Sequence, residues 1–290
     1  MNAKKALKWI GISIGGVVGL VLLGTAVVYV VIGSDLSRTF DVPLTKIAVP
    51  DDQVSTTEGQ RLAQVYGCFN GCHGDTVTGD VFFEVPDGTV LVSPDLAAAA
   101  NKYSVAELAR MIRHGVRPDG TSVLIPMPSE MFYNLSDAHI GSIIGFLQSQ
   151  TPRDEPLPRT YFGPVGRLML LLFKQDTGTI LAAEMINHDS ARLDASPDDP
   201  EAYGKYIAMT SCPECHGPDL HGWPDDNVPS LAIVAAYSLE DFTTLLRTGE
   251  PIGGRELDLM AEAAIKGFSH FTDSEIAALY AYLRTLISSR

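Results

Sequence analysis

The chain has 290 residues, 46% of them hydrophobic, and a formal net charge of −14, a length that allows two compact domains. Three of its 21 basic residues lie before residue 9, so residues 34–290 carry 18 basic and 35 acidic side chains, a formal −17. This charge excludes nucleic acid and anionic lipid as favourable partners of that part. It indicates either a partner protein with a basic docking surface or a simply solubilising surface.

The first predicted element is a membrane-spanning helix. An uncharged apolar run of 24 residues, Trp9–Ile32, follows three lysines and is long enough to cross a bilayer core of ~30 Å. The lysines favour an N-in topology, so residues 1–33 are predicted to be a single-pass anchor in a bacterial cytoplasmic membrane, with the remainder in the periplasm. A cleaved signal peptide with Gly24-Thr25-Ala26 as its cleavage site is the alternative. The run stays apolar beyond that site, which favours the anchor.

Residues 34–52 are predicted to be a linker because they contain Pro43 and Pro50 and no clear periodicity. A fully extended linker of this length reaches at most ~70 Å. The domains that follow could therefore sit on the membrane or away from it.

All four cysteines lie in two segments that end in Cys-His. Cys212-Pro213-Glu214-Cys215-His216 is the c-type haem attachment pattern, in which two thiols form thioethers and the His ligates iron. Cys68-Phe69-Asn70-Gly71-Cys72-His73 has one extra residue, which Gly71 accommodates because glycine tolerates unusual backbone angles. Zinc or a redox dithiol is disfavoured because the pairs lie in separate halves of the chain, each followed by His. The sequence predicts two covalent haem c groups, with a single thioether through Cys72 as the alternative in the first motif.

The two halves of the chain repeat one another. In each half an amphipathic helix follows a Ser and a last helix follows a Ser or Thr. The predicted N-caps are Ser104, Ser136, Ser238 and Thr272. No strand-like alternation of useful length is present, so the predicted fold is all-α: a transmembrane helix followed by helical domains at 53–150 and 201–290.

Residues 151–200 are predicted to connect these domains. The segment contains a short apolar stretch, 167–174, which is too short to span a membrane. It is predicted to form a helix that packs between the two domains, with a contact at the membrane surface as the alternative.

Each haem iron needs a second axial ligand besides His73 or His216. Met127 lies between two prolines in the first repeat, and Met260 lies at the corresponding place in the second. A thioether ligand favours Fe(II) and raises the reduction potential. Met127 and Met260 are therefore the predicted sixth ligands, in the loop before each last helix, and Met131 is the less suitable candidate in the first repeat.

Both repeats resemble class I c-type cytochrome domains, on the strength of the Cys-His motifs, the proline loops and the methionines. The resemblance implies that the carbonyls of Pro94 and Pro229 accept hydrogen bonds from the ligand histidines. It also implies that Arg113 and Arg247 lie near haem propionates, although a solvated helix face is an equal alternative for each. The membrane-anchored dihaem arrangement is similar to cytochrome subunits of bacterial respiratory oxidases and dehydrogenases.

The sequence favours an electron-transfer protein over an enzyme, because two axial protein ligands leave no coordination site for a substrate. The expected partners are redox proteins of the respiratory chain: an oxidase, a dehydrogenase or a quinol–cytochrome c reductase. A dihaem peroxidase or a haem-based ligand sensor is the alternative. The candidate acid–base residues for a peroxidase are His114, His139, His188, His221 and His270, most of which are expected on the surface.

Overall fold

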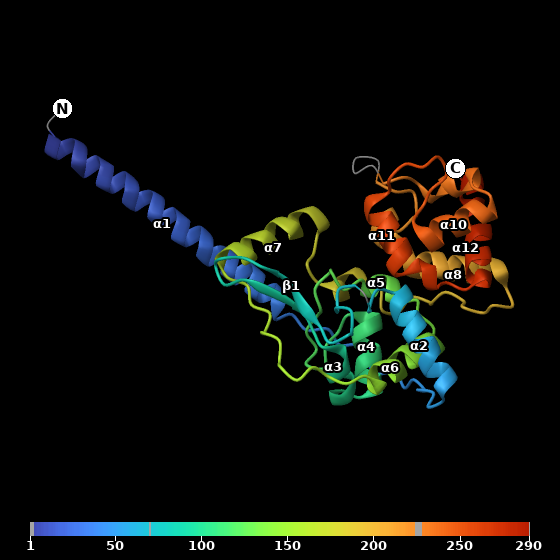
Figure 1. The fold of residues 1–290 in the computed structure, drawn as a ribbon. Coiled ribbons are helices and arrows are strands. Elements are labelled where there is room, and N and C mark those ends of the chain that lie inside the picture. The colour runs from blue at the N-terminus through green and yellow to red at the C-terminus, as the bar shows by residue number, and fades with distance from the viewer. Residues whose placement is uncertain (1–2, 70, 224–227, 290) are drawn as a thin grey trace.

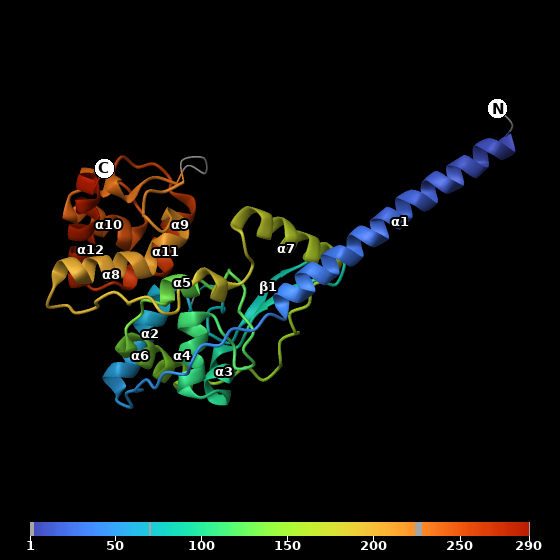
Figure 2. The same cartoon turned by 180° about the vertical axis from the view of Figure 1, so that it is seen from behind.

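The structure, a computed structural model, describes residues 3–69, 71–223 and 228–289 and is mostly helical. Helix α1 (Ala3–Leu36) projects as a rod from a body in which the second repeat lies at the far end (Figures 1 and 2). The first repeat contains α2 (Gln53–Val65), β1 (Asp80–Glu84), β2 (Val90–Ser93), α3 (Leu96–Lys102), α4 (Val105–His114), α5 (Ser129–Phe132) and α6 (Asp137–Ser149). The connecting segment contains α7 (Pro164–Thr177) and η1 (Ala182–Met185). The second repeat contains α8 (Pro200–Ser211), α9 (Pro213–His216), η3 (Leu231–Ala236), α10 (Leu239–Thr248), α11 (Asp258–Lys266), η4 (Phe268–His270), α12 (Asp273–Thr285) and η5 (Leu286–Ser289).

The four predicted N-caps are confirmed. Ser104 and Ser136 accept hydrogen bonds from the backbone N–H groups at the starts of α4 and α6. Ser238 and Thr272 do the same for α10 and α12, which satisfies N–H groups that have no partner inside a helix. The repeat seen in the sequence is therefore a repeat of helix boundaries.

The first and last helices of each repeat cross at a glycine. A Cβ on Gly59 of α2 would lie 1.9 Å from the carbonyl oxygen of Ser142 in α6. A Cβ on Gly204 of α8 would lie 2.2 Å from the carbonyl oxygen of Ala278 in α12. No side chain fits at either crossing, so glycine sets how closely the two helices approach. The apolar faces of these helices supply about half of the residues in the main buried core.

A short antiparallel hairpin, β1–β2, departs from the all-helical prediction. Its register has an irregularity between Val81 and Phe83, and the side chains of both strands are at most half-buried. Strands are recognised in a sequence by alternation between a buried and an exposed face. This hairpin has no fully buried face, so that signal is weak.

The linker before α2 packs against the first repeat rather than extending into solvent. The N–H of Phe40 donates to the carbonyl of Gly120 at 2.9 Å, and Arg110 Nη1 donates to the carbonyl of Val42 at 3.1 Å. Val42 is buried. The possibility that this linker holds the helical body far from α1 is therefore wrong.

The short apolar helix of the connecting segment also differs from its prediction. Helix α7 lies beside the C-terminal part of α1, not between the two repeats (Figures 1 and 2). Lys174 of α7 forms an ion pair with Asp35 of α1 at 2.7 Å. Leu170 and Leu171 pack against the buried cluster that contains Ile32 of α1, so the apolar residues that suggested a domain contact are partly used to hold α1.

We expect Gly59→Ala and Gly204→Ala each to lower the free energy of unfolding by about 1–3 kcal/mol, because the added methyl overpacks the helix crossing. Alanine also has a helix propensity that is ~1 kcal/mol more favourable than that of glycine. This gain reduces the loss but does not cancel it. Gln60→Ala and Lys205→Ala are the matched controls, since each changes an exposed neighbour in the same helix and should stay within about 0.5 kcal/mol of the parent. Denaturant titration of the full chain measures all four, and glycine variants as stable as the controls would contradict the crossing argument.

Candidate functional site

The second Cys-His motif forms a short helix at the end of α8. Cys212 ends α8, and Pro213 occupies the first turn of α9, a position where its missing N–H costs nothing. The N–H of His216 donates to the carbonyl of Cys212 at 3.0 Å. This turn places both thiols and the imidazole within one helical turn, with Cys215 exposed and Cys212 half-buried.

His216 is held by the proline loop that follows. Its Nδ1 lies 2.9 Å from the carbonyl oxygen of Pro229, and the residue is 9% exposed. A carbonyl can only accept, so Nδ1 carries the proton and Nε2 keeps a free lone pair. Burial also lowers the pKa of His216, which keeps the ring neutral. An oriented, neutral imidazole of this kind is what an axial iron ligand requires.

The first motif reaches the same arrangement by an irregular path. His73 Nδ1 lies 3.0 Å from the carbonyl oxygen of Pro94, and burial lowers the pKa of this histidine as well. Cys68 is half-buried and Cys72 is exposed; Asn70 lies outside the described residues. Both histidine–proline hydrogen bonds that the resemblance implied are thus present.

Glycine is needed in the first motif for a reason other than the predicted one. Gly71 does not have a positive φ; a Cβ there would lie 2.5 Å from the carbonyl oxygen of Gly67. The positive φ angles belong to Gly67 and Gly74, at 70° and 75°. Gly71 therefore permits a close approach of two backbone segments, while its neighbours make the unusual turns.

The donor set of each motif fits haem c. Each offers two thiols and a neutral imidazole with a free Nε2, and the four cysteines are all free. Haem c uses two thiolates for its vinyl groups and one imidazole for its iron. In each motif both thiols and the imidazole nitrogen are already in the chemical form that haem attachment needs.

The two candidate methionine ligands lie in different local structures. Met127 is in a turn just before α5, half-buried against the core, and its N–H donates to the carbonyl of Leu124 at 3.0 Å. Met260 lies in the first turn of α11, so its predicted place in a loop is wrong. It too is half-buried against the core.

Met131 is engaged elsewhere. It is buried in α5, and its sulfur accepts a hydrogen bond from the backbone N–H of Glu214 at 3.2 Å. This sulfur is directed at the Cys-His motif of the other repeat. The contact favours Met127 over Met131 as the sixth ligand in the first repeat.

Arg113 and Arg247 tie the middle helix of each repeat to its last helix. Arg113 is 4% exposed and donates to the carbonyl of Leu135 and to Asp137, so a solvated face is wrong for it. Arg247 donates to the carbonyl of Ser269 and to Asp273 at 2.8 Å. Both arginines therefore hold the N-terminal end of the last helix of their repeat, and the implied contact with a propionate stays a prediction.

The histidines considered for peroxidase chemistry have other partners. His114 Nδ1 lies 2.9 Å from His188 Nδ1, and His139 Nδ1 lies 2.8 Å from the hydroxyl of Tyr206. Burial, followed by the neighbouring His188 and arginines, lowers the pKa of His114 to about 4. The expectation that most of these side chains lie on solvated helix faces is wrong for His114 and His139.

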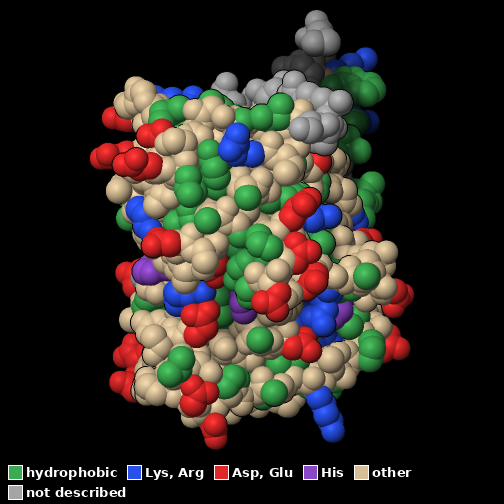
Figure 3. All heavy atoms as spheres, turned by 90° about the vertical axis from the view of Figure 1, so that its right-hand side faces the viewer, with side chains coloured by type: hydrophobic (Ala, Val, Ile, Leu, Met, Phe, Trp, Pro, Cys, Tyr) green, Lys and Arg blue, Asp and Glu red, His purple; other side chains and the backbone are tan. Residues whose placement is uncertain are grey.

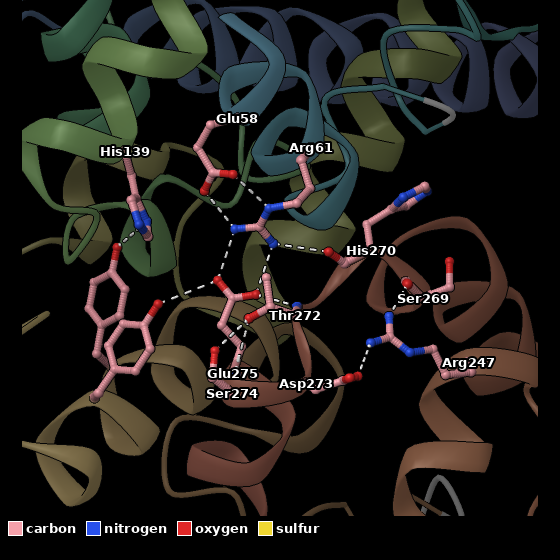
Figure 4. A network of polar contacts seen from close by, with 12 residues as sticks. Glu58, Arg61, His139, Arg247, Ser269, His270, Thr272, Asp273, Ser274 and Glu275 are labelled. Carbon is pink, nitrogen blue, oxygen red and sulfur yellow. Dashed lines mark hydrogen bonds and ion pairs between the residues drawn. The ribbon is translucent and has the colours of Figure 1, made fainter. Parts of the chain in front are cut away.

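The two repeats meet through a polar network that the sequence did not reveal (Figure 4). Arg61 of α2 pairs with Glu58 at 2.6 Å and reaches across to Glu275 of α12 at 2.8 Å. Tyr206 of α8 reaches in the opposite sense, to His139 and to the N–H of Ser136 in the first repeat. Complementary partners at such separation in the chain leave no local sequence pattern.

The two repeats contact each other through equivalent positions, as in an approximate twofold arrangement. Arg61 stands two residues after the crossing glycine of α2, and Tyr206 stands two residues after the crossing glycine of α8. Their partners Glu275 and His139 each stand three residues after the N-cap of the last helix. The first helix of each repeat thus contacts the start of the last helix of the other.

This twofold arrangement brings the two Cys-His motifs to the interface between the repeats. Met131 of the first repeat contacts Glu214 inside the second motif. The pKa of the Cys72 thiol is raised by burial and, to a smaller extent, by the Glu214 carboxylate. A group in one motif therefore lies within electrostatic reach of a thiol in the other.

Comparison with known proteins agrees with this geometry. Residues 201–286 match the family model of cytochrome c. The chain is 23% identical over 260 residues to the fructose dehydrogenase cytochrome subunit of Gluconobacter japonicus, covering 80% of this chain and 52% of that protein. It is 25% identical over 266 residues to the alcohol dehydrogenase (quinone) cytochrome c subunit of Gluconobacter oxydans, covering 78% and 53%. The gluconate 2-dehydrogenase cytochrome c subunit of Pantoea cypripedii is 22% identical over 286 residues, covering 82% and 62%.

The chain spans about half the length of the first two of these relatives. The matched family segment coincides with α8 to α12, in which the His216–Pro229 hydrogen bond lies. A cytochrome c domain binds its haem covalently through the Cys-His motif that this segment contains. Residues 201–286 therefore form a domain of the cytochrome c family.

Proposed function

We propose that this chain is a membrane-anchored dihaem c-type cytochrome that transfers single electrons on the extracytoplasmic side of a bacterial cytoplasmic membrane. The observation that carries the proposal is the repeated histidine–proline pair: His73 with Pro94 and His216 with Pro229. The second pair lies in the matched cytochrome c domain. The first has the same geometry, which supports a second haem.

In this function the protein holds and tunes the iron rather than reacting itself. Each proline carbonyl orients one imidazole, and Met127 and Met260 would each supply the second protein ligand of one haem iron. Haem c supplies the one-electron chemistry when bound. The second motif faces the first repeat through the contact of Glu214 with Met131, an arrangement that supports electron exchange between the proposed haems within the chain.

The proposed anchor is α1. Among the described residues, Leu7–Leu36 has a mean hydropathy of 2.4 and its most apolar window is not buried by any other part of the protein. A signal sequence near an N-terminus would meet the same criteria. The uncleaved anchor is supported by the apolar run beyond Ala26 and by the packing of the last turns of α1, through Ile32, on the helical body.

The proposed electron donor is a dehydrogenase, because the relatives are cytochrome subunits of fructose, alcohol and gluconate dehydrogenases. Purification of the tagged chain from native membranes in mild detergent should yield a dehydrogenase whose substrate reduces the haems. Haems that are reduced only by a quinol–cytochrome c reductase, with no dehydrogenase present, would contradict this assignment.

We expect two covalent haems on each chain. Mass measurement after denaturation should show the mass of two haem groups, and the band should retain haem stain on a denaturing gel. Cys212→Ala with Cys215→Ala should leave one haem, and Cys68→Ala with Cys72→Ala should leave the other. Alkylation of the denatured parent chain separates two thioethers from one, because Cys68 gains the mass of the alkylating group only if it forms no thioether. A parent chain with one haem would remove the first repeat from the proposal.

We expect Met127→His and Met260→His each to lower the potential of one haem by on the order of 0.1–0.3 V, within the ~0.8 V span that axial ligation gives. Each change should also remove part of the weak sulfur-to-iron band of the oxidised spectrum. Met131→Leu is the control and should leave the band intact. Loss of the band in Met131→Leu, or carbon monoxide binding by the reduced parent chain, would contradict the ligand assignment, and the latter would favour a peroxidase or sensor.

A further inference from the structure

Helix α7 carries an apolar stripe that no part of the described chain covers. Five large apolar residues recur at helical spacing, and each is between 41% and 56% exposed: Val165, Leu168, Met169, Leu172 and Phe173. They occupy positions i, i+3, i+4, i+7 and i+8, so they form one face. A continuous face of this kind on a protein surface marks an interaction site more often than isolated exposed residues do.

The opposite face of α7 is fixed to α1. The guanidinium of Arg167 lies 4.4 Å from the ring centroid of Tyr29, and Lys174 pairs with Asp35 at 2.7 Å. Between them, Leu170 and Leu171 pack on the buried cluster of Ile32, Ile180 and Leu181. The arginine contact is a cation–π interaction, and the apolar contacts exclude water along the same side.

The N-terminal end of α7 is fixed by the β1–β2 turn. Asp87 accepts a hydrogen bond from the N–H of Val165 at 2.7 Å, which satisfies one of the free N–H groups at the helix start. A Cβ on Gly166 would lie 2.4 Å from the hydroxyl of Thr89, so the helix sits tightly on the turn. Held at its end and along one face, α7 presents the apolar stripe in a set direction.

The contacts of α7 lie at the level where α1 would leave the bilayer. A hydrocarbon core of ~30 Å takes ~20 helical residues, so a span that starts near Trp9 ends near Tyr29. The residues that α7 contacts, Tyr29 to Asp35, would then lie among the outer headgroups. Both views place α7 beside this part of α1 and apart from the second repeat (Figures 1 and 2).

The local charge also differs from that of the rest of the body. Helix α7 contains Arg167, Lys174 and Asp176, a formal +1, whereas residues 34–290 are formally −17. On the face drawn in Figure 3, acidic side chains are spread over the whole surface, with basic ones among them. Helix α7 is therefore a segment that can approach lipid phosphates without strong repulsion.

We propose that α7 is an interfacial helix whose stripe, Val165 to Phe173, inserts into the headgroup and acyl boundary of the outer leaflet beside α1. This inference rests on the proposed anchor and adds a second membrane contact. An interfacial helix buries its apolar face ~5–10 Å into the boundary. With α1 it gives two contacts, which fix the tilt of the helical body relative to the membrane.

The test uses spin labels on the full haem-loaded chain in phosphatidylcholine vesicles. Single cysteines are introduced by Leu168→Cys and Leu172→Cys in the stripe, Val17→Cys in α1 and Val54→Cys in α2. Val54 is the matched control, since it is an exposed apolar residue far from α1. The parent chain without an added cysteine measures background labelling. Collision with oxygen, which concentrates in lipid, is compared with collision with a water-soluble nickel complex.

We expect the labels at 168 and 172 to lose access to nickel and gain access to oxygen relative to 54, at a depth shallower than 17. Nickel access at 168 and 172 equal to that at 54, with 17 deep in lipid, would overturn the interfacial helix and leave the anchor intact. Loss of access to both collision partners would also overturn it, because another protein surface would then cover the stripe. A water-exposed label at 17 would overturn the anchor itself, and the interfacial helix with it.

Discussion

The hydrogen bond between a motif histidine and a proline carbonyl is the constraint on which the candidate site depends. It fixes the protonated nitrogen of the ring and leaves the other nitrogen free, in both repeats. To make this bond, the helix before the motif and the loop after it must meet at a set distance. The glycine crossings of α2 with α6 and α8 with α12 provide that distance, because they fix where the first helix ends relative to the rest of the repeat.

The contact between the repeats uses equivalent positions with different chemistry. At one end a guanidinium lies between two carboxylates, and at the other a tyrosine hydroxyl meets an imidazole. Removing one partner from a buried ion pair is strongly destabilising, although the pair itself contributes little net stability. Arg61 and Glu275 therefore select one arrangement of the two repeats over others more than they strengthen it. Because that arrangement brings both motifs to the interface, it matters for packing and for the proposed electron exchange.

The local features of the fold could be predicted from the sequence, and the long-range ones could not. Ser104 and Thr272 identify helix starts because capping depends on neighbours a few residues away. The hairpin β1–β2 was missed because neither of its faces is fully buried. Met260 was assigned to a loop because the Gly-rich segment before it gives no indication that α11 begins at Asp258.

The candidate site shows the same division. Cys-His spacing predicts the haem attachment residues, and the matching proline loops predict the carbonyl partners that the structure confirms. The contact of Met131 with Glu214 spans two repeats and 83 residues, so no sequence pattern reports it. The role of Gly71 was predicted from conformational freedom, whereas the structure shows a close backbone approach to Gly67.

Packing contacts, and not the length of the linker, hold the helical body against α1. A linker of this length could allow the body to move tens of ångströms from a membrane. Instead it pairs with the loop at Gly120, while α7 binds the last turns of α1 from the other side. The last turns of α1 are thus part of the folded core around Ile32. A rotation of the body about α1 would break the Lys174–Asp35 ion pair and expose Ile32, so the body and the proposed anchor have one preferred relative orientation.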